Sequence, residues 1–307
     1  MLLSLVFFTF GFFILVRGAD YFVDGASAFA GRMRISAMMV GLTVVAMGTS
    51  LPELAICITS ALNGSSAIAI GNVIGSNVVN VLFVLGILAI LSPLMVHRRN
   101  IFYEMPFILI IIAVLYCIAS YYSVLSRFWA GVLLILFLLY LLYLFIVSRP
   151  AFSQTSVTTN GISGSKIILY LAIGLVAVIF GSDIIVKSAT QIAEHIGVSE
   201  RIIGLTVIAL GTSLPELVTG IVAVRKNQPD IAVGNIIGSS IFNMLFVLGV
   251  GAMVAPMYFE DAFIFDLCMS SIAILMLILC SYRTMRINRI AGIVFLIVYV
   301  LYIINLV

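Results

Sequence analysis

Two nearly identical stretches decide the fold of this 307-residue chain. Residues 41–54 read GLTVVAMGTSLPEL and residues 204–217 read GLTVIALGTSLPEL, with twelve of the fourteen positions identical at an offset of 204 − 41 = 163 residues. The same offset relates GNVIGSNVVN at 71–80 to GNIIGSSIFN at 234–243. A register of this length without a gap predicts an internal duplication.

The composition of the chain is that of a protein embedded in lipid. Hydrophobic residues make up 64% of it and charged residues 9%, with a mean hydropathy of +1.31, whereas a soluble domain is about half apolar and about a quarter charged. A soluble enzyme, a secreted disulfide scaffold and a nucleic-acid binder are therefore excluded. The four cysteines lie in apolar runs without a CxxC pair, which predicts buried thiols and neither disulfides nor a metal site. The chain is predicted to be an integral membrane protein with the lipid bilayer as its partner.

Ten stretches approach the roughly 20 apolar residues that a membrane span needs. The first is expected to be a retained span and not a signal peptide, because it has no basic leading region and no cleavage site. A polar linker at 148–165 separates a first repeat, 1–147, from a second, 166–307. The predicted spans are 2–29, 36–60, 66–91, 102–122, 128–147, 166–192, 200–223, 231–254, 262–281 and 289–306.

Five spans per repeat is an odd number, so consecutive copies must face opposite ways in the membrane. Basic residues test this, because they gather in cytoplasmic loops. Only Arg127 and Arg201 lie in the loops after the even-numbered spans. The loops after the odd-numbered spans, including the linker, hold Arg32, Arg34, Arg98, Arg99, Arg149, Lys166, Arg225, Lys226, Arg283, Arg286 and Arg289. The sequence predicts an all-α membrane protein of ten transmembrane helices in two inverted-topology repeats, with both termini extracytoplasmic. Many secondary transporters have this architecture and bind substrate where the repeats meet.

One glutamate in each repeat, Glu53 and Glu216, falls in the middle of a predicted span. A carboxylate at the bilayer centre costs about 2.5–3.5 kcal/mol, and no basic residue is predicted at that depth on these spans. A bound cation is the simplest compensating partner. The alternative is a pair of protonated glutamates that form hydrogen bonds within the bundle.

A proline precedes each of these glutamates and predicts a broken helix. Pro52 and Pro215 cannot donate a backbone N–H to the residue four positions back, and their rings clash there. We expect an unwound turn in each helix that presents carbonyl and hydroxyl oxygens beside the acid. The residues concerned are Thr49 and Ser50 in the first repeat and Thr212 and Ser213 in the second.

The third and eighth spans carry polar residues at i, i+4 and i+8, which places them on one helical face. The residues are Asn72, Ser76 and Asn80 in the first repeat and Asn235, Ser239 and Asn243 in the second. Their predicted role is cation coordination, and the alternative is hydrogen bonding between packed helices. Glycine pairs on the same spans, 71/75 and 234/238, predict close helix approach.

The candidate ligands are all oxygen atoms, because His97 and His195 fall in or near predicted loops. Oxygen ligands favour hard ions over zinc or copper, and calcium accepts six to eight of them. Two carboxylates match one divalent ion or two monovalent ions, which suits an exchanger. No cofactor is expected, and the transported ions are the ligands.

The paired GTSLPE and GNxIGS segments resemble the alpha repeats of the sodium/calcium exchanger family, within the calcium/cation antiporter superfamily. The resemblance covers essentially the whole chain, and the short linker is similar to that of prokaryotic members without a calcium-sensing insert. It implies exchange of calcium for sodium by alternating access in a prokaryotic inner membrane. It also implies that the first and sixth spans are sliding gate helices and that one monomer holds a complete site, with the oligomeric state left open.

The resemblance assigns roles to matching positions. Glu53 and Glu216 are implied to hold calcium together with the backbone carbonyls of Thr49 and Thr212. The implied sodium ligands are the carbonyls of Ala46 and Ala209 and the side chains of Ser50, Ser213, Ser76 and Ser239. Many family members have Asp where this chain has Asn243, so a three-sodium stoichiometry is not implied and protons remain an alternative coupling ion.

Asp20 and Asp183 occupy equivalent positions on the first and sixth spans, with basic residues nearby: Arg17 three positions before Asp20 and Lys187 four after Asp183. We expect local ion pairs there, with a place in the ion pathway as the alternative. A passive cation channel is a second functional hypothesis, although channels usually build a pore from several copies. An intramembrane enzyme is disfavoured, because no nucleophile and base occur together.

Overall fold

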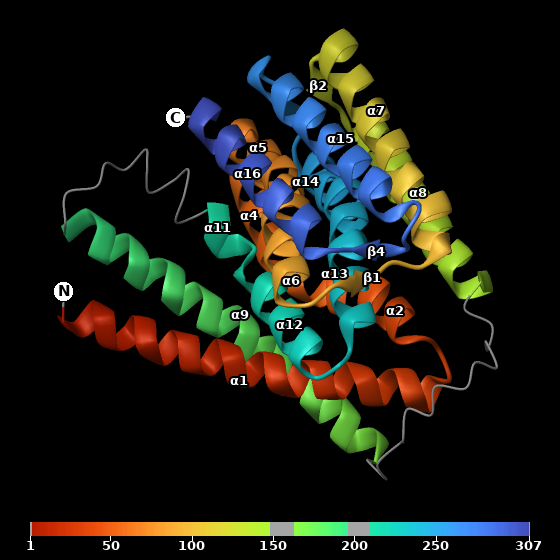
Figure 1. The fold of residues 1–307 in the computed structure, drawn as a ribbon. Coiled ribbons are helices and arrows are strands. Elements are labelled where there is room, and N and C mark those ends of the chain that lie inside the picture. Colours follow the sequence, from red (N-terminus) through yellow and green to blue (C-terminus); the bar gives the residue numbers. More distant parts are fainter. Residues whose placement is uncertain (1, 148–162, 196–208, 307) are drawn as a thin grey trace.

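The computed structural model describes residues 2–147, 163–195 and 209–306, and these are almost entirely helical (Figure 1). In the first half the helices are α1 (Leu2–Met33), α2 (Ala37–Val40), π-helical η1 (Gly41–Val45), α3 (Ala46–Thr49), α4 (Leu51–Leu62), α5 (Ser66–Val78), π-helical η2 (Val79–Val84), α6 (Leu85–Leu91), π-helical η3 (Asn100–Glu104), α7 (Met105–Tyr122) and α8 (Arg127–Val147). In the second half they are α9 (Gly164–His195), α11 (Ala209–Thr212), α12 (Leu214–Arg225), α13 (Pro229–Phe242), π-helical η5 (Asn243–Val247), α14 (Leu248–Val254), α15 (Ala262–Ser281) and α16 (Arg289–Leu306). The predicted all-α fold is confirmed.

Among the described residues, eight helical stretches are long and apolar enough to cross a bilayer. A ninth is the bent pair Ala37–Thr49 and Leu51–Leu62. These nine coincide with nine of the predicted spans. The other predicted span, 200–223, begins outside the described residues, and its described part is α11 and α12. The chain is therefore an integral membrane protein.

Two short antiparallel strand pairs connect the halves of the chain. β1 (Leu94–Met95) pairs with β4 (Arg286–Ile287), and β2 (Val124–Leu125) pairs with β3 (Met257–Tyr258). The 163-residue offset carries β1 onto β3, so the corresponding strand of each half pairs with the other half. Because α7 connects β1 to β2, the two pairs lie at opposite ends of the helical bundle (Figure 1). This strand pairing between the halves is the arrangement expected of two inverted copies.

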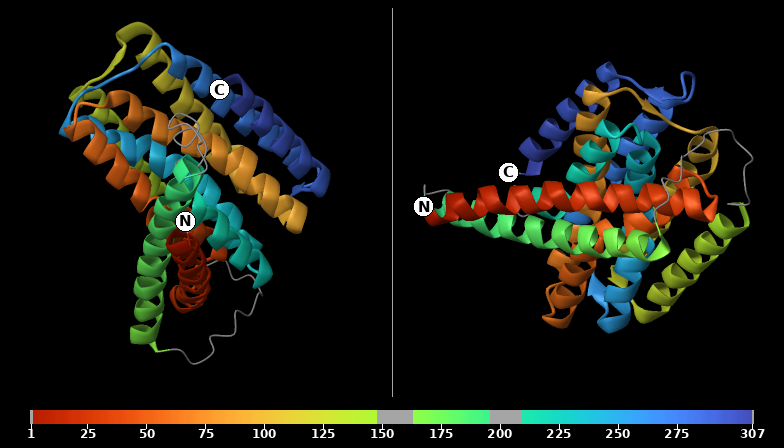
Figure 2. Two further views of the ribbon diagram at one scale, coloured as in Figure 1. Left: turned by 90° about the vertical axis from the view of Figure 1, so that its left-hand side faces the viewer. Right: turned by 90° about the horizontal axis from the view of Figure 1, so that it is seen from below.

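α1 and α9, the first helices of the two halves, lie side by side across the other helices (Figure 2). Glycines bring their backbones together: a Cβ on Gly174 would lie 2.5 Å from the backbone nitrogen of Phe22. Gly11 faces Ile184 and Gly25 faces Leu171, so the numbering falls along α9 as it rises along α1. The two helices are therefore antiparallel and packed as one unit.

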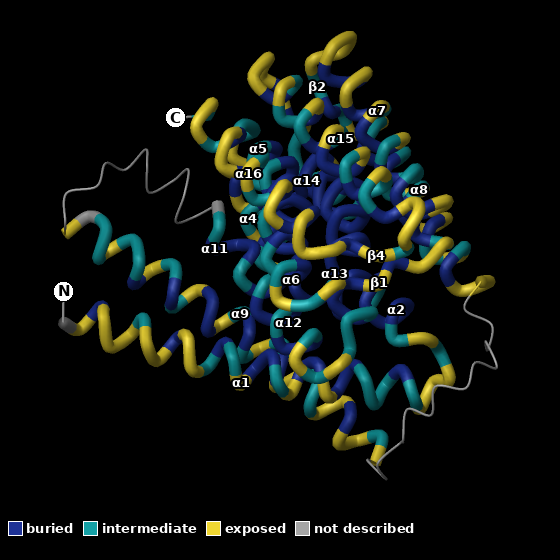
Figure 3. The backbone as a smooth tube through the Cα atoms, viewed as in Figure 1, coloured by how far each residue is buried: buried dark blue, intermediate teal, exposed yellow. Residues whose placement is uncertain are grey.

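The buried centre of the molecule is α13, which is shielded along almost its whole length (Figure 3). It packs against α2, η1 and α3 through two small residues. A Cβ on Gly234 would lie 2.6 Å from the Met38 carbonyl oxygen, and one on Gly238 would lie 2.5 Å from the Leu42 carbonyl oxygen. The close approach predicted for this glycine pair is confirmed. For the pair at 71 and 75, the equivalent partners fall at 201–209, mostly outside the described residues.

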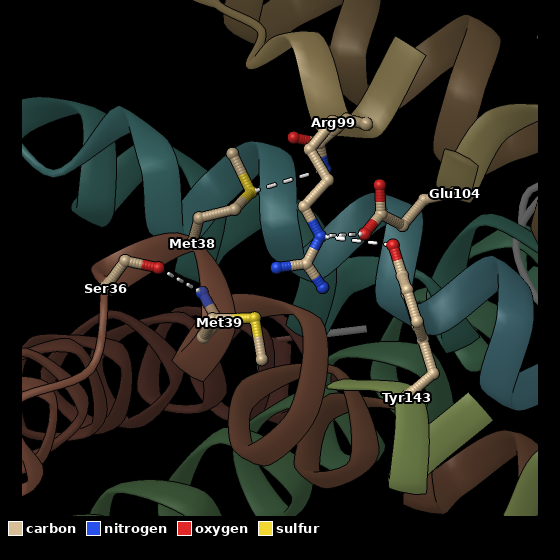
Figure 4. Close-up of polar contacts among 7 residues, drawn as sticks. Ser36, Met38, Met39, Arg99, Glu104 and Tyr143 are labelled. Atoms are coloured by element: carbon tan, nitrogen blue, oxygen red, sulfur yellow. Dashed lines mark hydrogen bonds and ion pairs between the residues drawn. The ribbon is translucent and has the colours of Figure 1, made fainter. Parts of the chain in front are cut away.

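An ion pair at η3, away from the repeated motifs, is linked to α8 by a hydrogen bond to Tyr143 (Figure 4). Arg99 Nε donates to Glu104 Oε1 at 2.9 Å and to the Tyr143 hydroxyl at 3.3 Å, and the Glu104 side chain is fully buried. Asn100 Nδ2 lies 3.6 Å from Met38 Sδ and extends the cluster to α2. The offset places alanine and leucine at the positions equivalent to Arg99 and Glu104, so this cluster belongs to one half only.

Candidate cation-binding site

The two spans that carry the GTSLPE motif both break at a serine. α3 ends at Thr49 and α4 begins at Leu51, with a 43° bend at Ser50. In the second half, Ser213 separates α11 from α12. Both serines have φ near −90° and ψ near 0°: −87° and 10° for Ser50, and −89° and 3° for Ser213.

Each break is narrower than the unwound turn expected from the sequence. Pro52 and Pro215 lie in the first turn of the helix that follows the break. A missing N–H costs nothing there, because the first turn of a helix has no acceptor for it. One non-helical residue is therefore enough to accommodate each proline.

The two glutamates follow the breaks and are fully buried. Glu53 lies in the first turn of α4 and Glu216 in the first turn of α12. Ser50, three residues before Glu53, donates to the Glu216 carboxylate, so the two acids are neighbours and their negative charges repel each other. The positive end of each helix dipole faces its own acid and offsets part of this repulsion. Two acids from different halves thus share one buried region.

Hydrogen bonds between the two halves, and one within the second half, surround the Glu216 carboxylate and its neighbours. Ser50 Oγ donates to Glu216 Oε1 at 3.1 Å, and Thr49 Oγ1 donates to Asn235 Oδ1 at 3.1 Å. Ser239 Oγ lies 3.5 Å from the Ala46 carbonyl oxygen and 3.4 Å from Glu216 Oε1.

The other two contacts join the third span to the broken helices. The hydroxyls of Ser76 and Thr212 lie 3.5 Å apart, across the halves. Asn72 instead donates to the Glu53 carbonyl oxygen at 3.3 Å, within its own half.

The remaining asparagines lie in π-helical segments. Asn80 is within η2 and Asn243 begins η5, and both side chains are fully buried. Single π-helical turns inside α-helices occur frequently at functional sites. The repeat offset aligns the two segments, so this distortion was duplicated with the motif. The sequence motifs did not predict these π-helical segments.

Several buried polar atoms at the site have no protein hydrogen-bond partner within the described parts of the chain. They include both carboxylate oxygens of Glu53, one oxygen of Glu216, the Ser213 hydroxyl and the amide groups of Asn80 and Asn243. Buried polar atoms are normally paired, so this cluster of oxygens fits a cation ligand set. Across the described residues, no three His, Cys, Asp or Glu side chains cluster. The available donor set is two carboxylates with hydroxyl, amide and carbonyl oxygens.

The structure places the fourteen candidates on eight helical segments and the two breaks. Ala209 begins α11, and its side chain is not described. The positions are Ala46 and Thr49 on α3, Ser50 at the first break, Glu53 on α4, Asn72 and Ser76 on α5, Asn80 in η2, Ala209 and Thr212 on α11, Ser213 at the second break, Glu216 on α12, Asn235 and Ser239 on α13, and Asn243 in η5.

Ser182 is a site residue that the sequence motifs did not reveal. Its hydroxyl, on α9, donates to the Gly211 carbonyl oxygen at 3.0 Å. That carbonyl is the one that Pro215 leaves without its helical N–H partner. The repeat offset hid this residue, because the equivalent position on α1 is Ala19.

The expected local ion pairs occur in one half only. Lys187 pairs with Asp183 at 2.7 Å within α9, as predicted. On α1, Asp20 and Asp24 pair instead with Lys226, which follows α12. The position of Arg17 three residues before Asp20 did not predict this, because a lysine from another span reaches both acids.

Similarity to known proteins identifies the family to which this architecture belongs. The family described as "Sodium/calcium exchanger protein" matches residues 3–146 and 166–307. The chain belongs to the sodium/calcium exchanger family. It is 36% identical to the "Putative antiporter CaxA" of Alkalimonas amylolytica over 98% of each chain. It is 30% identical to the "Sodium/calcium exchanger MaX1" of Methanosarcina acetivorans, over 100% of this chain and 97% of the relative.

Solved structures of the sodium–calcium exchanger NCX_Mj have the same fold. The structure soaked with 2.5 mM Na⁺ and 0.1 mM Ca²⁺ matches with a TM-score of 0.87 and 31% sequence identity, over 100% of this chain and 99% of that one. Membership in the exchanger family confirms the resemblance inferred from the GTSLPE and GNxIGS segments. It makes the chain a cation antiporter of the prokaryotic type, without a regulatory insert between its halves.

Proposed function

We propose that this protein exchanges calcium for sodium across a membrane by alternating access. The observation that carries the proposal is the pair of hydrogen bonds that joins the two halves beside the buried glutamates. Ser50 of the first half bonds Glu216 of the second, and Thr49 bonds Asn235. A site built jointly by two halves changes its access when the halves shift relative to each other, as in other transporters with inverted repeats.

Calcium is the cargo that best matches the charge and ligands. Glu53 and Glu216 supply two negative charges and three oxygens without a protein partner. The carbonyls of Thr49 and Thr212, beside the breaks, complete the proposed calcium shell. The proposed sodium ligands are the carbonyls of Ala46 and Ala209 and the side chains of Ser50, Ser213, Ser76 and Ser239. Asn72, Asn80, Asn235 and Asn243 are proposed as further cation ligands.

The proposed topology is two inverted repeats of five spans, 1–147 and 166–307, joined by a cytoplasmic linker. The exchange of strands between halves supports it. The excess of Arg and Lys at the β1–β4 end places that end in the cytoplasm and both termini outside. We assign the protein to a prokaryotic inner membrane, as a transporter and not an enzyme, with one chain sufficient for one complete site.

Calcium/proton exchange is the second candidate, favoured by Asn243. An amide there leaves the described site with two acids, so fewer cation charges are balanced than with a third carboxylate. The "Putative antiporter CaxA" is an antiporter without a named ion pair. The two candidates share the same cargo and differ in the coupling ion.

Flux in sealed proteoliposomes tests the proposal. Purified protein is reconstituted, and calcium uptake is followed with an outward sodium, potassium or proton gradient imposed separately. Uptake driven by sodium alone supports sodium/calcium exchange, and uptake driven by the proton gradient supports the second candidate. Calcium uptake that is equal under all gradients would identify a passive channel and refute both.

A further inference from the structure

Lys226 connects α1 to the core at one end of the molecule. Its ammonium group lies 2.8 Å from Asp24 Oδ1 and 3.4 Å from Asp20 Oδ1, and it donates to the Asp20 carbonyl oxygen at 2.9 Å. The side chains of Lys226, Asp20 and Asp24 are 28%, 37% and 49% exposed. One lysine therefore holds two successive turns of α1 through three contacts.

Among the residues that the structure describes, the other half of the chain has no equivalent connection. The offset of 163 residues carries Asp20 to Asp183, Asp24 to Lys187 and Lys226 to Asn63. Lys187 pairs with Asp183 on its own helix at 2.7 Å, so that pair ties α9 to nothing else. Asn63, after α4, is exposed and uncharged. The two repeats thus differ in the charges at these three pairs of equivalent positions.

The connection lies at the β1–β4 end of the bundle. Lys226 precedes α13, whose Asp230 pairs with His97 Nε2 at 3.2 Å, just after β1. Asn63 precedes α5, which packs against β3 at the opposite end. The lysine and its asparagine counterpart therefore lie at opposite mouths of the proposed transport path.

α1 and α9 move together if they move at all, because their glycines place the two backbones in direct contact. α1 contacts the core along α12, where Lys226 is attached. In the proposed alternating access, opening the β1–β4 end moves α1 away from α12 and separates Lys226 from both aspartates. Opening the other end breaks no corresponding charge pair among the described residues.

We propose that Lys226 is a positioning residue that holds α1 on α12 and biases the exchanger toward the state closed at the β1–β4 end. The inference rests on the proposed alternating access. Partly exposed ion pairs shift an equilibrium by up to about fivefold each. Loss of both pairs with Lys226 is expected to shift the ratio of the two states by about two- to tenfold.

Lys226→Asn, which installs the residue of the other half, is the main test. Spin labels at exposed Met33 of α1 and exposed Met95 of β1 report the width of the β1–β4 end in full-length protein in lipid nanodiscs. The longer-distance population should rise two- to tenfold in Lys226→Asn and stay unchanged in Lys226→Arg. Arg225→Asn is the matched control, because it removes a neighbouring exposed positive charge that has no ion-pair partner among the described residues.

A second variant tests the asymmetry even where Lys226→Asn fails to fold. Asn63→Lys with Lys187→Asp rebuilds the three charges at the opposite mouth and should also increase the longer-distance population. Equal distance populations in the wild type and both variants would overturn the proposal. Sodium-driven calcium uptake is measured on the same samples: shifted populations without uptake would refute the proposed function alone, and normal uptake with unshifted populations would refute the role of Lys226 alone.

Discussion

Replacing either buried glutamate by glutamine is the most direct test of the site. Glu53→Gln and Glu216→Gln each remove one of the two negative charges while keeping the shape of the side chain. Breaking a buried charge pair costs about 3–5 kcal/mol, and 1.4 kcal/mol corresponds to a tenfold change in affinity. The calcium Kd is therefore expected to rise by between about two and three and a half orders of magnitude.

The fold should survive both substitutions. At position 216 the amide oxygen can still accept the hydroxyl groups of Ser50 and Ser239, which lie 3.1 and 3.4 Å from Glu216 Oε1. The other carboxylate oxygen has no protein partner, and it becomes an NH₂ group that cannot bind a cation. Because a buried charge is removed, stability without calcium is expected to be unchanged or higher.

Thermal unfolding with and without calcium separates affinity from stability. A ligand that binds only the folded state raises Tm with concentration, so the wild type should show a calcium-dependent rise that both variants lose. Glu104→Gln is the matched control, since Glu104 is also fully buried and pairs with Arg99 outside the site. It should lower Tm without calcium and keep the calcium-dependent rise. A calcium-dependent rise of wild-type size in both site variants would refute the assignment.

Three further outcomes are expected. Asn243→Asp adds a third acid to the buried site, so cation affinity should increase by at least tenfold or the reversal potential should change. Calorimetry measures the affinity, and voltage-dependent flux measures the reversal potential. No change in either would exclude this position from coordination. Gly174→Ala places a Cβ 2.5 Å from the α1 backbone and should destabilise the folded protein by about 1–3 kcal/mol. Gly131→Ala, with no described atom within 4 Å of its Cβ, should leave the stability unchanged. Equal melting temperatures of the two variants would contradict the close packing of α1 and α9. The hydrogen bond that His97 Nε2 donates to Asp230 Oδ2 raises the pKa of His97 above its usual 6.5. This pair should therefore contribute up to about 1 kcal/mol of stability below pH 6.5 and lose it as pH rises through the raised pKa. His97→Gln should abolish that part of the pH dependence of Tm.

The backbone chemistry of proline and the helical spacing of polar residues predicted much of the site. The prolines of the two GTSLPE segments marked the helix breaks, because a missing N–H disrupts a helix wherever it occurs. The breaks span one residue and not a whole turn, since Pro52 and Pro215 lie in the first turn of the following helices. The i, i+4, i+8 spacing placed the serines and asparagines on one face. The π-helical segments at Asn80 and Asn243 had no sequence signal, because they depend on packing around the helix.

The amino-acid sequence by itself determined the membrane class, the duplication, nine helical spans that the structure describes and the pair of acids at broken helices. These features follow from hydrophobicity, repetition and backbone chemistry, which act over a few neighbouring residues. Only the tertiary structure decided that Ser50 bonds Glu216, that Ser182 accommodates the Gly211 carbonyl and that Lys226 reaches α1. These partners lie 166, 29 and 202 positions apart in the chain, and the folded packing of helices, which no local pattern encodes, brings them within reach of one another.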